Sequence, residues 1–160
     1  MTKTGPYQPT DAAARALAKE LLTKAAFAAL AVLRPDGLTP SISRIALATD
    51  DAGCPVSLIS TLADHTQALQ TNPSCALLIG EPADKGEPLT HPRLTLHAIA
   101  RLVEKETREH SVLRARYLSL RPKAKLYADF SDFGFVHFDV QDGVLNGGFG
   151  KAYRLTPDDL

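Results

Sequence analysis

The front of the chain carries apolar residues at the spacing of an α-helix, with charged residues between them. Thr10 and Asp11 are both residue types that begin helices, because their side chains accept backbone N–H groups. The segment 1–26 is therefore expected to hold a helix that packs on the rest of the domain by one apolar stripe. The residues expected in that stripe are Leu17, Leu21, Leu22 and Ala25.

From Phe27 onward the pattern changes to short apolar or alternating runs separated by turn residues, which is typical of β-strands. Pro35-Asp36-Gly37 predicts a turn between the first two strands. Helical spacing returns at 61–72 and 104–120. Strands are expected at 27–33, 39–48, 55–60, 74–79, 93–103, 133–140 and 143–149, the last two as a hairpin around Gln141-Asp142-Gly143.

These elements predict a mainly β (β+α) fold, in which six to seven antiparallel strands form a β-barrel with peripheral helices. Most connections are too short for the crossovers of a parallel sheet. The 160 residues fit a single domain, 1–160, with 1–26 as an N-terminal helical segment packed on the barrel.

Charge and cysteine usage exclude several classes of partner. Lys plus Arg and Asp plus Glu both number 18, so neither nucleic acid nor a membrane surface is an expected partner. The sequence contains no apolar signal core and no apolar run of membrane-spanning length, and we expect a cytoplasmic protein. Cys54 and Cys75 lack Cys-x-x-Cys spacing and the histidines form no close pair, so spacing predicts no metal site.

The segment Gly147-Gly148-Phe149-Gly150-Lys151-Ala152 combines three glycines, an aromatic ring and a cation. Glycine permits positive φ and close approach of a ligand, and the N–H groups of such a turn can converge on an anion. Phe149 and Lys151 would add a stacking face and a charge, making the segment one wall of a site. A β-bulge and a tight turn before a last strand explain the same residues equally well.

Arg44 is a charged residue in the middle of a predicted strand, on a face shared with Ile42, Ala46 and Ala48. The two alanines leave room beside the guanidinium, and a charge that points toward a barrel needs a partner or an anion. The alternative is an arginine on the solvated face of a half-exposed strand.

Ser60 and Thr61 stand where a predicted strand ends and a helix begins. Helix N-termini present unpaired N–H groups that bind phosphate, and Arg44 and His65 would add charge and a donor. The alternative is that one of the two hydroxyls only caps the helix. Arg93, after the proline-rich loop, is a further candidate for contact with the ligand. No side chain stands out as a general acid or base, so the catalytic residues stay unknown.

In this order the motifs resemble the FMN-binding split-barrel superfamily, which is typified by pyridoxamine 5′-phosphate oxidase. The resemblance is closer to its haem-utilisation branch, the HugZ-like proteins. It spans most of the chain from Phe27 and is carried by three groups of motifs. These are Ser43-Arg44; the run from Ile59 to Thr66 with Asn72-Pro73; and Tyr117, Pro122 and Asp132-Phe133 with the glycine segment 147–152.

The resemblance implies a homodimer with FMN in a groove between the subunits. It implies that the FMN phosphate or ribityl chain is bound by Arg44, Ser60, Thr61, His65 and Thr66, with Gln67 and Arg93 nearby and with Phe149 and Lys151 closing over the groove.

Departures from the family pattern leave the ligand open. Asp64-His65 replaces the Arg-Lys pair of the oxidase, Ala68 replaces an asparagine common in relatives, and the chain has no tryptophan. The leading hypothesis is an FMN-binding oxidoreductase of unknown substrate. The alternatives are a haem-binding or haem-degrading protein, with His65, His91 or His137 on the iron, and a dimeric binding module without a ligand.

Overall fold

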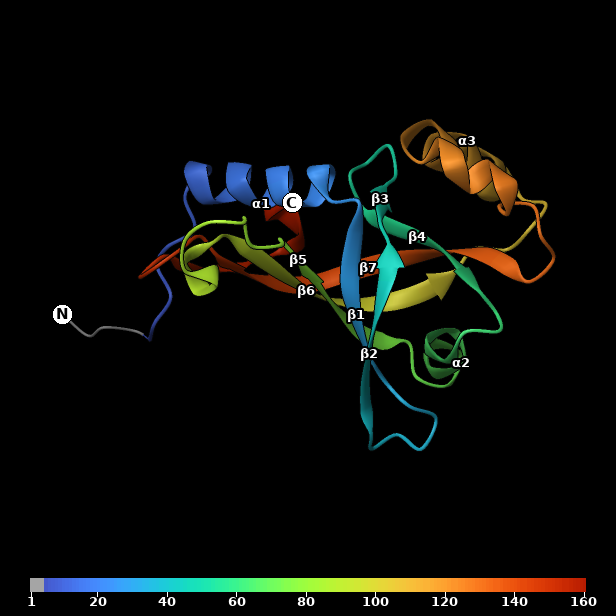
Figure 1. Ribbon diagram of the computed structural model, residues 1–160, viewed down its shortest axis with the longest axis horizontal. Helices are drawn as coiled ribbons and strands as arrows, with labels where there is room; N and C mark the ends of the chain where they lie inside the picture. The colour runs from blue at the N-terminus through green and yellow to red at the C-terminus, as the bar shows by residue number, and fades with distance from the viewer. Residues whose placement is uncertain (1–4) are drawn as a thin grey trace.

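A single antiparallel sheet of eight strands organises residues 5–160, the part of the chain that the computed structural model describes (Figure 1). The predicted mainly β fold with peripheral helices is confirmed. The strands are β1 (Phe27–Leu33), β2 (Pro40–Ala46), β3 (Ala48–Thr49), β4 (Pro55–Ser60), β5 (Ser74–Ile79), β6 (Arg93–Leu102), β7 (Phe133–Asn146) and β8 (Ala152–Leu155).

The strand order explains why the sheet curls. Hydrogen bonding runs β2-β1-β5-β6-β7-β4-β3, with β8 added to β7. The two ends of this order, β2 and β3, follow one another in the chain with only Leu47 between them. The chain can join the two ends through one residue only if the sheet bends round on itself. The result is a curled half-barrel.

Leu47 interrupts what alternation predicts as one strand over 39–48. Its N–H donates to the carbonyl of Ala26 at 3.0 Å, outside the sheet, and its side chain is fully buried. Up to Ala46 the predicted alternation holds, because Ile45 is buried whereas Arg44 is exposed. Beyond the break the pattern shifts, so Ala48 is buried and leaves the face that it was predicted to share with Arg44.

The predicted hairpin around Gln141-Asp142-Gly143 is wrong, because β7 runs through these residues without a turn. His97 pairs with Asp142 and Ala98 with Val140, which leaves Gln141 as the extra residue of a β-bulge. A Cβ at Gly143 would come within 3.0 Å of the carbonyl oxygen of Thr95. Glycine is needed there for close approach between strands and not for a turn.

In the described part of the chain, three helices flank the sheet: α1 (Ala12–Lys24), α2 (Asp64–Thr71) and α3 (Arg108–Leu120), together with the 3-10 turns η1 (Pro88–Thr90), η2 (Pro122–Leu126) and η3 (Pro157–Asp159). In the view of Figure 1, α1 and α3 lie above the sheet and α2 lies below it. Within residues 5–160, no helix combines the length and the apolar character needed to cross a membrane.

Helix α1 begins as predicted, since the Asp11 carboxylate accepts the N–H of Ala14 at 2.8 Å. Its fully buried stripe is Ala14, Ala18 and Leu22, and the predicted Leu17 and Leu21 are half-buried at the edge. Small side chains on the buried stripe let the helix lie close to the sheet.

The C-terminus is tied to α1 by Asp159. The Asp159 carboxylate accepts from Arg15 Nε at 2.6 Å and from the N–H of Thr156 at 2.8 Å. The hydrogen bonds from Thr156 and Arg15 hold the pKa of this carboxyl below its usual range. Because the folded pKa is the lower one, the stabilisation is present above the unfolded pKa and is lost as pH falls through the folded value.

We predict that Asp159→Asn lowers the free energy of unfolding by about 1–3 kcal/mol at pH 7. Urea denaturation of both proteins at pH 7 and in acid measures the difference. The difference in the free energy of unfolding between the native protein and the variant should shrink as the pH drops below about 4, the range in which a free aspartate is protonated. An equal gap at both pH values would show that the charge of Asp159 is unimportant.

Candidate functional site

Three of the predicted site residues line one groove. Arg44 of β2, Ser60 at the end of β4 and His65 of α2 share a groove of about 350 Å³. Tyr127 and Phe133, which follow η2, complete the far wall. Apolar atoms of Ile45, Ala46, Leu58, Ile59 and Ala63 fill the remaining surface. The groove is therefore apolar with one cation and one imidazole.

Arg44 supplies the cation. It stands opposite Ala29 of β1, and its guanidinium carbon lies 5.0 Å from the centre of the Phe27 ring. This cation–π contact orients the side chain but leaves it exposed to an incoming anion. The two interpretations of Arg44, as an anion-binding residue and as a solvent-exposed residue, are therefore compatible, because the exposed strand face that carries it borders the groove.

His65 supplies the imidazole. Its Nδ1 lies 3.1 Å from Ser43 Oγ, while its Nε2 is buried and has no hydrogen-bond partner within residues 5–160. Burial lowers the pKa of His65, against a smaller opposing effect of Asp64, and so favours the neutral ring. With the Nδ1 proton donated to Ser43, Nε2 presents a lone pair, as a metal-ligating histidine does.

Tyr127 and Phe133 give the groove an aromatic wall of two tilted rings. Their ring centres are 4.9 Å apart with planes at 47°, and Phe130 packs edge-on against Phe133 at 6.4 Å. Sequence reasoning missed Tyr127, because it lies in the irregular stretch after η2, where no periodicity indicates which way a side chain faces. A planar apolar ligand fits such a wall.

The strand-to-helix turn is a poorer anion cradle than its sequence suggests. The N–H groups of Thr61 and Ala63 already donate to the carbonyls of Asp132 and Ser60 at 2.7 and 3.1 Å. Ser60 Oγ donates to Asp132 Oδ2 at 2.8 Å. Thr66 is buried, and its hydroxyl donates to the Ser60 carbonyl at 2.6 Å, so its structural role is local.

Neither Ser60 nor Thr61 is the N-cap of α2. The N-cap is Ala63, so no side chain caps the first N–H groups of the helix. Gln67 lies on the other side of α2 from the groove, in a smaller hollow with Arg34 and Asp64. These positions leave Arg44, Ser60 and His65 as the part of the predicted phosphate set that faces the groove.

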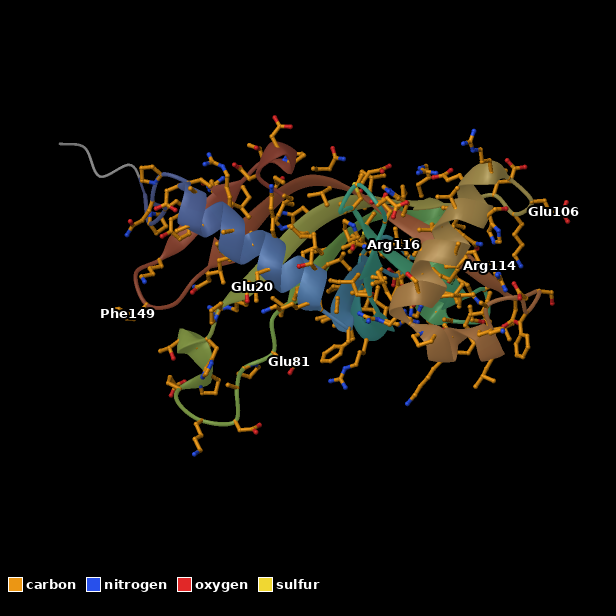
Figure 2. The ribbon with its side chains drawn as sticks, turned by 90° about the horizontal axis from the view of Figure 1, so that it is seen from above. Glu20, Glu81, Glu106, Arg114, Arg116 and Phe149 are labelled. Atoms are coloured by element: carbon orange, nitrogen blue, oxygen red, sulfur yellow. The ribbon has the colours of Figure 1, made fainter. Side chains whose placement is uncertain are left out.

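Arg93, Phe149 and Lys151 lie at a different end of the molecule from the groove. Arg93 opens β6 opposite Asn146, and the glycine segment forms the tip of the β7–β8 hairpin, closed by a 2.7 Å bond from the N–H of Gly147 to the carbonyl of Lys151. Phe149 is 96% exposed, and Figure 2 shows it at the end of the molecule opposite Glu106 and Arg114. The segment is a tight turn before the last strand, β8, and its part in a ligand site stays a prediction.

The other two histidines considered for haem iron differ in their contacts. His137 is held between carboxylates, with Nε2 2.9 Å from Asp50 and Nδ1 2.9 Å from Asp139. His91 has an unpartnered buried Nε2 within residues 5–160, but it lies in the loop beside Gly86 and away from the groove. Of the three, His65 alone lines the groove that contains Arg44.

Comparison with known proteins points to one family. The family model described as pyridoxamine 5′-phosphate oxidase matches residues 14–145. The chain is 40% identical over 115 residues, 71% of its length, to the chloroplast haem oxygenase HOZ of Arabidopsis thaliana. It is 28% identical over 105 residues, 64% of its length, to the haem oxygenase HutZ of Vibrio cholerae.

A solved structure of a haem-binding protein from Mycobacterium smegmatis superposes with a TM-score of 0.82 at 28% identity, covering 95% of this chain and 60% of that one. The matched regions make up 34% of the Arabidopsis protein and 60% of the Vibrio protein. The expected likeness to the split-barrel superfamily and its haem branch is confirmed. This chain belongs to the pyridoxamine 5′-phosphate oxidase family.

Proposed function

We propose that the chain binds haem in the groove between Arg44 and Phe133 and takes part in haem breakdown. The observation that carries the proposal is His65, whose buried Nε2 has no hydrogen-bond partner in residues 5–160 and which lines that groove. An unsatisfied buried nitrogen costs free energy unless something binds it. An iron ion is the kind of partner that an imidazole nitrogen takes.

The remaining groove residues suit the rest of a haem molecule. The macrocycle is large and apolar, and the Tyr127 and Phe133 rings offer it an apolar aromatic contact surface. Its propionates are anionic, and the exposed guanidinium of Arg44 borders the same groove. Bound haem would supply redox chemistry at its iron, while these side chains hold and orient it.

FMN is the second candidate ligand, because the family match is to an FMN-type oxidase fold and Arg44 would pair with a phosphate as well as with a propionate. Two observations count against it. The turn at Ser60-Thr61 uses its N–H groups internally, and the first turn of α2 carries the negative charge of Asp64. Both reduce the attraction of this helix end for a phosphate.

The function is tested by offering both ligands. Purified protein is mixed with equimolar hemin and FMN, desalted and examined by absorbance. We expect a saturable, shifted Soret band and little flavin. Retained flavin with free hemin would support an FMN-binding protein instead, and loss of both ligands would support the ligand-free module.

Arg44→Ala tests the propionate contact. We predict hemin binding weakened by about 1–3 kcal/mol, the strength of a charged hydrogen bond, and no such loss for hemin dimethyl ester, which has no carboxylates. Fluorescence quenching titrations with both ligands give the comparison. Equal losses with hemin and with its ester would mean that Arg44 acts on the shape of the groove and not on an anion.

We further propose that the groove is covered by a second copy of the chain. Ile42, on the same strand face as Arg44, is 73% exposed, and Leu62, beside the Ser60 turn, is 78% exposed. Apolar side chains of this size flanking an open groove are typical of an interface. Phe149 and Lys151 would then reach the ligand only from the partner subunit.

Light scattering should give a mass of twice 17.2 kDa for the native chain and a monomer for Ile42→Asp. Val112→Asp is a control, because Val112 is also exposed, at 51%, but lies in α3 and does not line the groove. A monomeric native chain would contradict the dimer.

A further inference from the structure

A second group of side chains, separate from the groove, has the composition of a transition-metal site. A carboxylate oxygen of Asp50, a ring nitrogen of His137 and the thiol of Cys54 all lie within 4.8 Å of one another, and all three residues are partly buried. We propose that these three residues bind a divalent first-row metal ion, with zinc as the best match for the mixed oxygen, nitrogen and sulfur donors.

The three donors come together through the fold and not through sequence spacing. Asp50 and Cys54 flank the turn between β3 and β4, and His137 lies on β7 opposite Val56 of β4. Asp50 Oδ1 closes the turn by accepting the N–H groups of Ala52 and Cys54, both at 2.9 Å. That leaves Oδ2 of Asp50 free to face Nε2 of His137, at 2.9 Å.

The distances suit a tetrahedral ion. Zinc bonds of about 2.0–2.3 Å to oxygen, nitrogen and sulfur place neighbouring ligand atoms roughly 3.3–3.6 Å apart. The separations in the structure, 2.9 Å between Nε2 and Oδ2 and at most 4.8 Å for the set, lie on either side of that range, so the donors would have to shift on binding. Three protein ligands would leave the fourth position to water.

The contact on the other side of His137 is the one that metal-binding histidines make. Its Nδ1 lies 2.9 Å from Asp139 Oδ1, so the Nδ1 proton is held by a carboxylate while Nε2 faces the proposed ion. Asp139 thereby fixes the ring orientation. It would be a positioning residue and not a ligand.

The neighbouring cations are engaged elsewhere. Arg101, opposite His137 on β6, pairs with Glu109 at 2.8 Å and lies 3.9 Å from Asp139. Arg116 of α3 lies 3.6 Å from Asp51. The carboxylate of Asp50 therefore faces His137 and not a guanidinium. Burial and the nearby carboxylates raise the pKa of Cys54, and a divalent ion would reverse that effect by binding the thiolate.

An ion at this position would clamp the β3–β4 turn to β7 and stabilise the folded chain. Cobalt(II) is the probe of choice, because it occupies zinc sites and a bound thiolate gives a sulfur-to-metal charge-transfer band. The reduced protein, without a histidine tag and stripped with a chelator, is titrated with cobalt(II) and then with zinc. We expect one ion per chain, the charge-transfer band and its loss when zinc displaces cobalt.

The variants have matched controls in the same chain. Cys54→Ser should abolish the band, whereas Cys75→Ser, at the second free cysteine, should keep it. His137→Gln should likewise lose the ion, whereas His97→Gln should keep it, although His97 also pairs with an aspartate, Asp142, at 2.6 Å. Asp139→Asn should weaken cobalt binding by about 10–100-fold while leaving the thiolate band in place at saturation.

Absence of the band in the native protein, or its persistence in Cys54→Ser, would overturn the proposal. A variant that fails to fold is recognised by its circular dichroism, and Asp139→Asn then carries the test, since it retains all three ligands. Hemin binding should be unchanged in Cys54→Ser, so the metal site is tested independently of the proposed haem groove.

Discussion

Replacing His65 by alanine is expected to weaken hemin binding by more than about 100-fold, because loss of even an outer partner of a metal ligand costs ~10–100-fold. The reason lies in the geometry of the side chain. His65 lines the groove, its Nε2 is buried without a hydrogen-bond partner in residues 5–160, and its Nδ1 lies 3.1 Å from Ser43 Oγ, which fixes the ring. The Soret maximum should also shift, since its position reports the axial ligand. Absorbance titration of hemin into both proteins measures the two effects.

His97→Ala is the matched control for His65→Ala. His97 is half exposed and pairs with Asp142 on the outside of the sheet, away from the groove. Its loss should leave hemin affinity unchanged. Ser43→Ala should give a smaller effect than His65→Ala, because it releases the ring without removing the ligand. Equal affinities for the native chain and His65→Ala would exclude His65 as the iron ligand.

Replacing Arg121 by methionine is expected to lower the free energy of unfolding by about 2–4 kcal/mol, since hydrogen bonds from a charged group contribute about 1.5–3 kcal/mol each and their effects overlap. The Arg121 guanidinium donates to the carbonyl of Leu47 at 2.7 Å and to that of Ala25 at 2.6 Å. Both carbonyls lie where regular structure stops, at the β2–β3 break and after α1. Without Arg121 these half-buried acceptors lose their partner.

Arg114→Met provides the comparison for Arg121→Met in urea denaturation. Arg114 makes two short bonds, of 2.7 and 2.6 Å, but to an exposed carboxylate, that of Asp129. Surface pairs of this kind contribute at most about 1 kcal/mol. Arg121→Lys should fall between the two, because an ammonium keeps the charge but cannot reach both carbonyls with a planar fork. Similar losses for Arg114→Met and Arg121→Met would show that the buried carbonyls are unimportant.

Sequence patterns predict most strands, whether the partner is near in the chain, as for β1 and β2, or distant, as for β4 and β7. Phe27–Leu33 and Pro40–Ala46 face one another across a short turn, and their buried and exposed positions follow the sequence pattern. Errors arise where a distant segment decides the outcome. Asp142-Gly143 has the composition of a turn, yet the close approach of β6 makes it the bulged middle of β7. Arg121 ends α3 as its place before Pro122 suggests, but its contact with the distant break at Leu47 has no local signal.

The candidate site is predictable only in part for the same reason. Residue chemistry indicates Arg44, Ser60 and His65, and the fold brings these three to one groove. Residue chemistry cannot indicate Tyr127, which reaches the groove from an irregular segment. It also cannot show that Thr66 is not a groove residue, because its hydroxyl donates to the Ser60 carbonyl. Cys54 and His137 show the same limit, because only the pairing of β4 with β7 places them together.

The most direct test of the account is a crystal structure of the hemin complex. It predicts iron bonded to His65 Nε2, a propionate beside the Arg44 guanidinium and the macrocycle against Tyr127 and Phe133. Hemin bound at the hairpin end near Phe149, or in the groove with His65 Nε2 left without iron, would contradict it.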